Sequence, residues 1–152
     1  LALPYLFQVS TCAKKGKNKQ WRPSRYEVGE ALLLHVKTIG DIEPTLLNRL
    51  KEKYEPFNLS LGHQAIVVGP DVDSIQQSYI RVNNILYKVD NARKALDITF
   101  KIFHSLDGKY HTEAEREWLF LERAVYGINE GKDGDGRIKS ICCEYLKFKS
   151  SN

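Results

Sequence analysis

Residues 79–89 hold the sequence feature that most constrains the fold. Two runs of alternating apolar and polar residues, YIRV and ILYKV, meet at Asn83-Asn84. Asn tolerates positive φ better than other non-glycine residues, and both central positions of a type I′ turn require positive φ. A two-residue turn at this point pairs Val82 with Ile85. The pattern therefore predicts a β-hairpin over about residues 79–89.

This register sorts the hairpin side chains onto two faces, because paired residues of an antiparallel ladder point to the same side. The first face is apolar and consists of Ile80, Val82, Ile85, Tyr87 and Val89. The second face is mixed and consists of Tyr79, Arg81, Leu86 and Lys88. We expect helices to cover the apolar face and water to reach part of the mixed face.

Two helices are predicted to follow the hairpin, within residues 91–128. Apolar residues recur every three or four positions from Asn91 to Leu106, which indicates an amphipathic helix. Thr112 and Glu115 have the spacing of a capping box, which predicts the start of the next helix at about residue 113.

A second helix pair is predicted within residues 24–55. Ser24 and Glu27 form a capping-box pattern, and apolar residues continue at helical spacing up to Gly40, a natural helix stop. An alternative interpretation is a helix-turn-helix that presents a second helix to a DNA groove. The residues offered would be Asn48, Arg49, Lys51 and Lys53. Acidic residues on the same helix would repel phosphate, so an ordinary αα-hairpin covering the sheet is favoured.

These elements predict an α+β fold, with a small antiparallel or mixed sheet built around the hairpin and the two helix pairs packed on it. A continuous apolar run at 65–68 predicts a strand buried on both faces, and residues 1–9 predict an N-terminal strand. With 152 residues, the chain is expected to form a single globular domain over 1–152. Its C-terminal segment, 129–152, is expected to be loop-rich.

The most concentrated charge lies in residues 13–25, AKKGKNKQWRPSR, which contain no acidic residue. One interpretation is a solvated connecting segment. The functional interpretation is phosphate binding or nuclear targeting, with Trp21 either stacking on a base or anchoring the segment to the core. The candidate nucleic-acid-binding residues are Lys14, Lys15, Lys17, Lys19, Trp21, Arg22 and Arg25. A basic face would extend further if Arg49, Lys51 and Lys53 joined them.

A weaker metal motif lies at residues 131–144, GKDGDGRIKSICCE, in which the run DGDGRI (133–138) matches the centre of an EF-hand loop. Asp133 and Asp135 would be calcium ligands. However, the first ligand position is Gly131, and the twelfth, which requires a bidentate Glu, is Cys142. Because neither Gly131 nor Cys142 supplies the carboxylate that an EF-hand has at its position, an acidic turn with no bound metal is favoured.

No catalytic motif is evident in the sequence. His35, His63 and Asp97 could converge in a pocket, but no spacing identifies a nucleophile with its base, and no cofactor motif is found. The three cysteines, an odd number that includes the adjacent Cys142 and Cys143, favour a reducing compartment.

These features favour a non-enzymatic interaction domain of an intracellular protein, with the nucleus as one location and a protein or nucleic acid as partner. The alternatives are a small enzyme whose site the sequence does not reveal, and a degenerate EF-hand-like calcium module. The apolar runs are far shorter than the roughly 20 residues that a membrane span needs, so no membrane association is expected.

Overall fold

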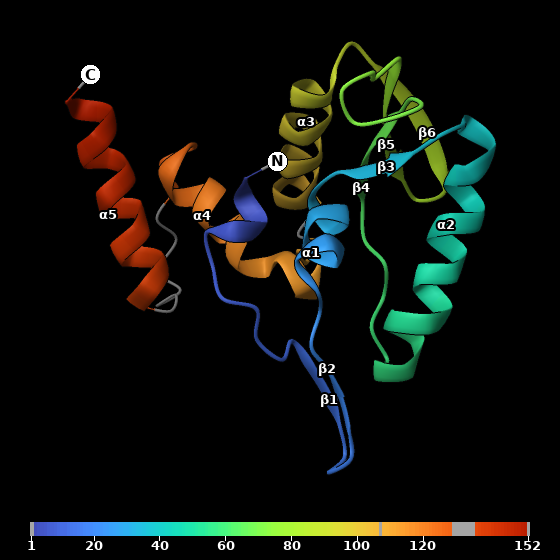
Figure 1. The fold of residues 1–152 in the computed structure, drawn as a ribbon, viewed down its shortest axis with the longest axis horizontal. Helices are drawn as coiled ribbons and strands as arrows, with labels where there is room; N and C mark the ends of the chain where they lie inside the picture. Colours follow the sequence, from blue (N-terminus) through green and yellow to red (C-terminus); the bar gives the residue numbers. More distant parts are fainter. Residues whose placement is uncertain (1, 107, 129–135, 152) are drawn as a thin grey trace.

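The computed structural model describes residues 2–106, 108–128 and 136–151. In chain order, the strands and α-helices of this part are β1 (Ala13–Lys15), β2 (Lys19–Trp21), α1 (Arg25–Leu32), β3 (Leu34–Val36), α2 (Ile42–Arg49), β4 (Gln64–Val68), β5 (Gln77–Val82), β6 (Ile85–Val89), α3 (Ala92–Ser105), α4 (Glu115–Ala124) and α5 (Gly136–Ser150). Figure 1 shows the main sheet and α3 between α2 at one end and α4 and α5 at the other. The β1–β2 hairpin projects away from this body.

The main sheet has four strands in the order β3-β4-β5-β6 and is mixed, as predicted. β3 and β4 are parallel, and the other neighbouring pairs are antiparallel. The parallel pair needs a long crossover connection, which α2 supplies. This arrangement confirms the predicted α+β class.

The central hairpin has the predicted register. Val82 pairs with Ile85 across the two-residue turn. Asn83 and Asn84 have φ angles of 47° and 68°, the left-handed values that a type I′ turn requires. Local turn chemistry and hydrophobic alternation therefore determine this element.

Helices pack on both faces of the sheet. Ile80 of β5 packs with Ala65 of β4 and Ala95 of α3, so α3 covers the part of the predicted apolar face around Ile80. Ile85 and Tyr87, assigned to the same face, are 55% and 48% exposed, so the prediction that helices cover this face is wrong for these two residues.

Tyr79 and Leu86 pack on the opposite face against a cluster that includes Ile42 and Leu46 of α2. The β3–α2–β4 crossover returns α2 over this face. However, Tyr79 and Leu86 are only partly buried and Lys88 is exposed, which confirms that water reaches part of the mixed face.

A second correction concerns the helix predicted to run from Ser24 to Gly40. The capping box at Ser24 and Glu27 is present, but α1 ends at Leu32, and Leu34–Val36 form β3. Leu33 adopts extended φ and ψ angles, after which Leu34 and Val36 pair with the buried strand β4. Pairing that buries apolar residues on both faces of the sheet overrides their helical spacing.

The helix-turn-helix alternative requires two helices joined at Gly40, which lies instead in a short 3-10 turn, Ile39–Asp41, after β3. α2 continues as a π-turn, Leu50–Tyr54, and a 3-10 turn, Glu55–Phe57. The β3 strand separates α1 from α2, so they do not form the predicted αα-hairpin either.

Both ends of the chain differ from the predictions. A 3-10 helix, Leu3–Tyr5, replaces the expected N-terminal strand. The 15-residue helix α5 occupies most of the segment that was expected to be loop-rich, and its Ile138 and Cys142 pack against Phe120 of α4. Asp133 and Asp135, the weak calcium candidates, lie outside the described residues.

The helix predicted to begin at residue 113 begins slightly later. Thr112–Ala114 form a 3-10 turn, and α4 starts at Glu115 with Ala114 at the N-cap. The predicted capping box is absent, because Thr112 lies in the 3-10 turn and Glu115 is the first helical residue of α4 rather than the third. Trp118 of α4 is fully buried in a cluster with Leu32 of α1 and Phe103 of α3, which joins α4 to these two helices.

We predict that Ile80→Ala will destabilise the fold by about 2–5 kcal/mol, because it removes a fully packed side chain between the sheet and α3. Ile85→Ala is a matched control on the same sheet face, where 55% of the side chain is exposed, against 6% for Ile80. Its cost should stay under about 1 kcal/mol. Urea denaturation measures both, and equal costs would contradict the observed packing.

Candidate functional site

The basic segment folds as a small β-hairpin, which we call the lysine hairpin (residues 13–21). Lys14 pairs with Gln20, and Lys15 pairs with Lys19. The turn begins at Gly16, whose φ of 65° suits glycine. The sequence analysis expected only a connecting segment here, although Gly16 in a polar turn was the available signal for a hairpin.

The lysines of the lysine hairpin point into solvent. Lys14, Lys15, Lys17 and Lys19 are all exposed, and none forms an ion pair with a residue that the structure describes. Like charges directly opposite each other destabilise a strand pair, and Lys15 faces Lys19 in this way. The repulsion between Lys15 and Lys19 therefore does not stabilise the hairpin, and the exposed ammonium groups remain available to an anion.

Trp21 anchors the lysine hairpin to the body of the domain. Its ring is 6% exposed and lies 5.5 Å from the ring of Tyr54 and 6.2 Å from that of Phe57, measured between centroids. Of the two roles stated for Trp21, this position supports the anchor, because the buried ring offers no free face to a base. The ammonium of Lys19 lies 5.8 Å from the centroid of Phe57, where a cation–π contact holds its stem against the base of the hairpin.

Arg22 and Arg25 follow the lysine hairpin and contact the N-terminal segment. Arg22 Nη2 donates a hydrogen bond to the carbonyl of Val9 at 3.2 Å. The guanidinium of Arg25 lies 5.0 Å from the ring centroid of Tyr5. Both arginines are exposed, so they extend the positive surface from the hairpin toward the start of α1.

The basic surface does not include Arg49. That side chain is only 8% exposed and is bonded to Glu113, 64 positions later in the chain. Lys53 forms an ion pair with Glu27 at 3.0 Å, so its charge is already matched. Among the residues considered on the second helix, Lys51 remains exposed.

Arg49 and Glu113 form the centre of a buried polar network. The hydroxyl of Tyr54 lies 2.7 Å from both carboxylate oxygens of Glu113, and Arg49 Nη1 donates to Gln64 at 3.5 Å. Gln64 in turn donates to the carbonyl of Glu30 at 3.0 Å. The network thus connects α1, α2, β4 and the turn before α4. Sequence reasoning missed it because its members are far apart in the chain and share no periodic pattern.

A small polar cavity of about 190 Å³ lies beside this network and is lined in part by Cys12, Glu113 and Glu117. Burial raises the pKa of the Cys12 thiol to about 12, so the thiol is protonated at neutral pH and is a poor nucleophile. The Glu113 carboxylate is already bonded to Arg49 and Tyr54. Burial also raises the pKa of Glu117 to about 7. These groups lack the nucleophile–base geometry of a catalytic site.

The three residues proposed to converge in a catalytic pocket have separate partners. His35 Nε2 lies 2.9 Å from the carbonyl of Gly69, whereas His63 packs against the ring of Phe103. Asp97 Oδ1 accepts a hydrogen bond from Tyr126 at 2.7 Å. Within the described residues, no group of three or more His, Cys, Asp or Glu side chains is arranged to hold a metal ion.

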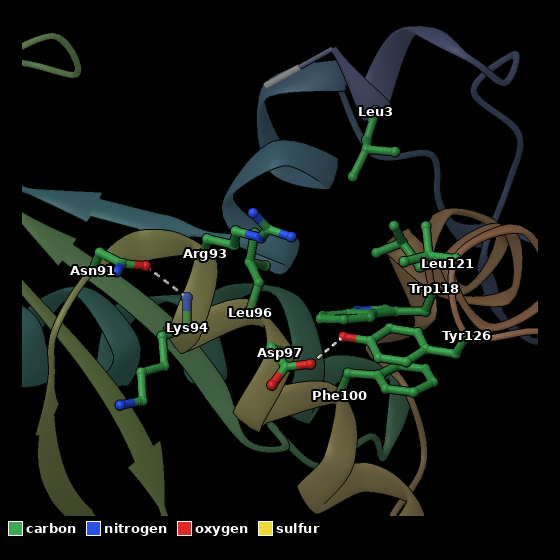
Figure 2. A pocket seen from close by; sticks show the side chains of 11 residues that line it. Leu3, Asn91, Arg93, Lys94, Leu96, Asp97, Phe100, Trp118, Leu121 and Tyr126 are labelled. Atoms are coloured by element: carbon green, nitrogen blue, oxygen red, sulfur yellow. Dashed lines mark hydrogen bonds between the residues drawn. The ribbon is translucent and has the colours of Figure 1, made fainter. Parts of the chain in front are cut away.

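A cavity of about 590 Å³ lies between α3, α4 and the 3-10 helix Leu3–Tyr5. Its walls are mainly apolar, with contributions from Leu96, Trp118 and Leu121 (Figure 2). Mainly apolar walls with a few polar groups, among them Arg93 and Asp97, are typical of pockets that bind small molecules.

Comparison with known proteins does not assign a family to this chain. No family model, curated protein or solved structure gives a significant match. Of the helices in the described ranges, none is both long and apolar enough to cross a membrane.

We predict that Arg49→Ala will destabilise the fold by about 3–5 kcal/mol, because it leaves the Glu113 carboxylate buried without its counter-charge. Lys53→Ala is the control, since the pair that it breaks with Glu27 is partly exposed and should contribute at most about 1 kcal/mol. Denaturant unfolding of both variants measures the difference. A cost for Arg49→Ala no larger than that for Lys53→Ala would contradict a structural role of the network.

Glu117 should give the fold a measurable pH dependence. Its pKa of about 7 in the folded state exceeds its usual value of 4.5, so the folded state binds the proton more tightly than the unfolded state. The corresponding stability is present below pH 4.5 and is lost as the pH rises through 7.

The neutral variant Glu117→Gln should therefore unfold with a free energy close to that of the parent at pH 4.5 and exceed it by up to about 3 kcal/mol at pH 8. Glu115→Gln, on the exposed side of α4, is the control and should show no such trend. Chemical denaturation of the three proteins across this pH range tests the prediction. A constant difference between Glu117→Gln and the parent would contradict it.

Proposed function

We propose that this chain is a non-enzymatic, intracellular interaction domain that binds nucleic acid through the lysine hairpin. The observation that carries the proposal is the set of exposed lysines, Lys14, Lys15, Lys17 and Lys19, none of them ion-paired with a described residue. They are held on a structured element that projects from the body of the domain (Figure 1). A preformed cationic element loses less conformational entropy on binding than a disordered basic tail does.

The positions of the lysines favour contact with phosphates over contact with bases. Lys14 and Gln20 point to one face of the lysine hairpin, and Lys15 and Lys19 point to the other. Positive charge on both faces suits the repeated phosphates of a nucleic-acid backbone. With Trp21 buried, the hairpin offers no aromatic ring to stack on a base. We therefore expect binding that depends little on base sequence.

The same residues support a proposal about location. A short Lys-rich segment is typical of nuclear-import signals as well as of nucleic-acid contacts. The segment is exposed on a projecting hairpin, where an import receptor could reach it. A nuclear, nucleic-acid-associated protein is the specific form of the proposed function.

The test is the binding of the full chain to a short DNA duplex and to a single strand, measured by fluorescence anisotropy over a range of salt concentrations. Affinity should fall steeply with salt and should change little between unrelated sequences. Replacing Lys14, Lys15, Lys17 and Lys19 by Ala should reduce the slope of log K against log salt by up to about 3.5 on duplex DNA, since each lost phosphate contact removes about 0.9. The fold should stay intact, because the variant removes the repulsion of Lys15 and Lys19 and loses only the exposed cation–π contact of Lys19 with Phe57, worth at most about 1 kcal/mol.

A charge-matched control separates a local contact from a general effect of net charge. Lys37, Lys51, Lys88 and Lys109 are exposed and lie outside the lysine hairpin, so their replacement by Ala lowers the net charge equally. This control should retain most of the affinity. Absence of binding at low salt, or equal losses in the two variants, would overturn the nucleic-acid proposal and direct attention to a protein partner.

A further inference from the structure

The cavity between α3 and α4 has the size and lining of a site for a small organic molecule. Its volume of about 590 Å³ lies within the roughly 300–1,000 Å³ typical of ligand pockets. Leu3, Leu96, Leu121 and Val125 supply aliphatic walls, and Trp118 supplies an aromatic one (Figure 2). An apolar body would gain free energy by leaving water for this cavity.

Aromatic rings make the inner wall rigid. Phe100 and Tyr126 stack with ring centroids 3.9 Å apart and planes inclined by 9°. Phe100 also packs near Trp118, whose ring plane is inclined to it by 23°. Trp118 and Phe100 are buried in the core, so packing fixes the inner wall, whereas exposed side chains such as Arg93 and Val125 form the rim.

Asp97, the acidic residue that lines the cavity, already has hydrogen-bond partners for both carboxylate oxygens. Asp97 Oδ1 accepts a hydrogen bond from the hydroxyl of Tyr126, and Oδ2 accepts one from Lys101 at 2.6 Å (Figure 2 shows the first). These hydrogen bonds lower the pKa of Asp97, so the carboxylate stays ionised with Lys101 as its counter-charge. Asp97 therefore does not require a cation from a ligand.

Arg93 is exposed and provides a positive charge at the cavity, where it acts on the Asp97 carboxylate from beyond ion-pair distance and helps to lower the pKa of Asp97. Figure 2 shows its guanidinium turned toward the space between Leu3, Leu96 and Trp118. It forms no ion pair with any residue that the structure describes, whereas its neighbour Lys94 points away and is paired with Asp90 at 2.6 Å. A guanidinium beside apolar walls is complementary to a carboxylate on an apolar body.

We propose that this cavity binds an amphipathic organic carboxylate, with its apolar body against Leu96, Trp118 and Leu121 and its carboxylate on Arg93. The body can be a flat aromatic ring system or an alkyl chain, since both share the chemistry that the cavity recognises. This site lies apart from the lysine hairpin and does not rest on the proposed nucleic-acid function.

The test is isothermal titration of the full chain with 1-naphthoate and with decanoate, each compared with its neutral amide. At least one acid should bind with a dissociation constant below 1 mM, and roughly 10- to 100-fold more tightly than its amide, because the amide lacks the charge-assisted contact with Arg93. A preference between the two acids identifies the aromatic or the alkyl body as the better fit.

Two kinds of variant locate the site. Arg93→Gln should remove the preference for acid over amide, whereas Lys94→Gln, one residue away, should preserve it. Leu121→Trp should fill the cavity and abolish binding of both compounds, with Val125→Trp at the exposed rim as a second filling variant should the first fail to fold.

The proposal is overturned if neither acid binds below 1 mM, if acid and amide bind equally, or if Arg93→Gln binds as the parent does. The lysine-hairpin variant with four Ala substitutions should bind the acid like the parent, so failure at this cavity and failure of nucleic-acid binding are separate results.

Discussion

The buried contact between Arg49 and Glu113 is the constraint on which the arrangement of the elements depends. A buried charge without a partner is strongly unfavourable, so α2 and the turn before α4 must lie where the two groups meet. The hydrogen bonds of Gln64 to Arg49 and to the Glu30 carbonyl add β4 and α1 to the same contact. Elements that are distant in the sequence are thus held together at one point in the core.

The lysine hairpin is connected to this contact through aromatic packing. Tyr54 donates its hydroxyl proton to Glu113 and packs its ring against Trp21. Trp21 therefore joins the exposed hairpin to the buried network, so the hairpin is anchored mainly by a buried ring rather than by its lysines. The packing of Trp21 stabilises the hairpin even though Lys15 and Lys19, which lie opposite each other, repel.

Sequence reasoning predicted the elements whose conformation depends on neighbouring residues. It was wrong for elements whose conformation depends on contacts with distant segments. The turn at Asn83 and Asn84 and the cap at Ser24 were correct, because both depend on neighbouring residues. β3 was mistaken for part of a helix, since its strand conformation comes from pairing with β4, about thirty residues away. The lysines were correctly placed at the surface. The Arg49–Glu113 contact and the cavity were missed, because each is assembled from distant segments without a sequence pattern.

The N-terminal segment is the physical link between the two surfaces proposed to bind ligands. Leu3 lines the cavity beside Trp118, Tyr5 packs against Arg25, and the carbonyl of Val9 accepts from Arg22. Shared contacts alone do not couple two sites, because coupling requires an element with two arrangements that both ligands bias. The contacts of this segment with the cavity are through Leu3, whereas its contacts with the hairpin side are polar or cationic. We therefore expect the free energies of binding at the two surfaces to be additive.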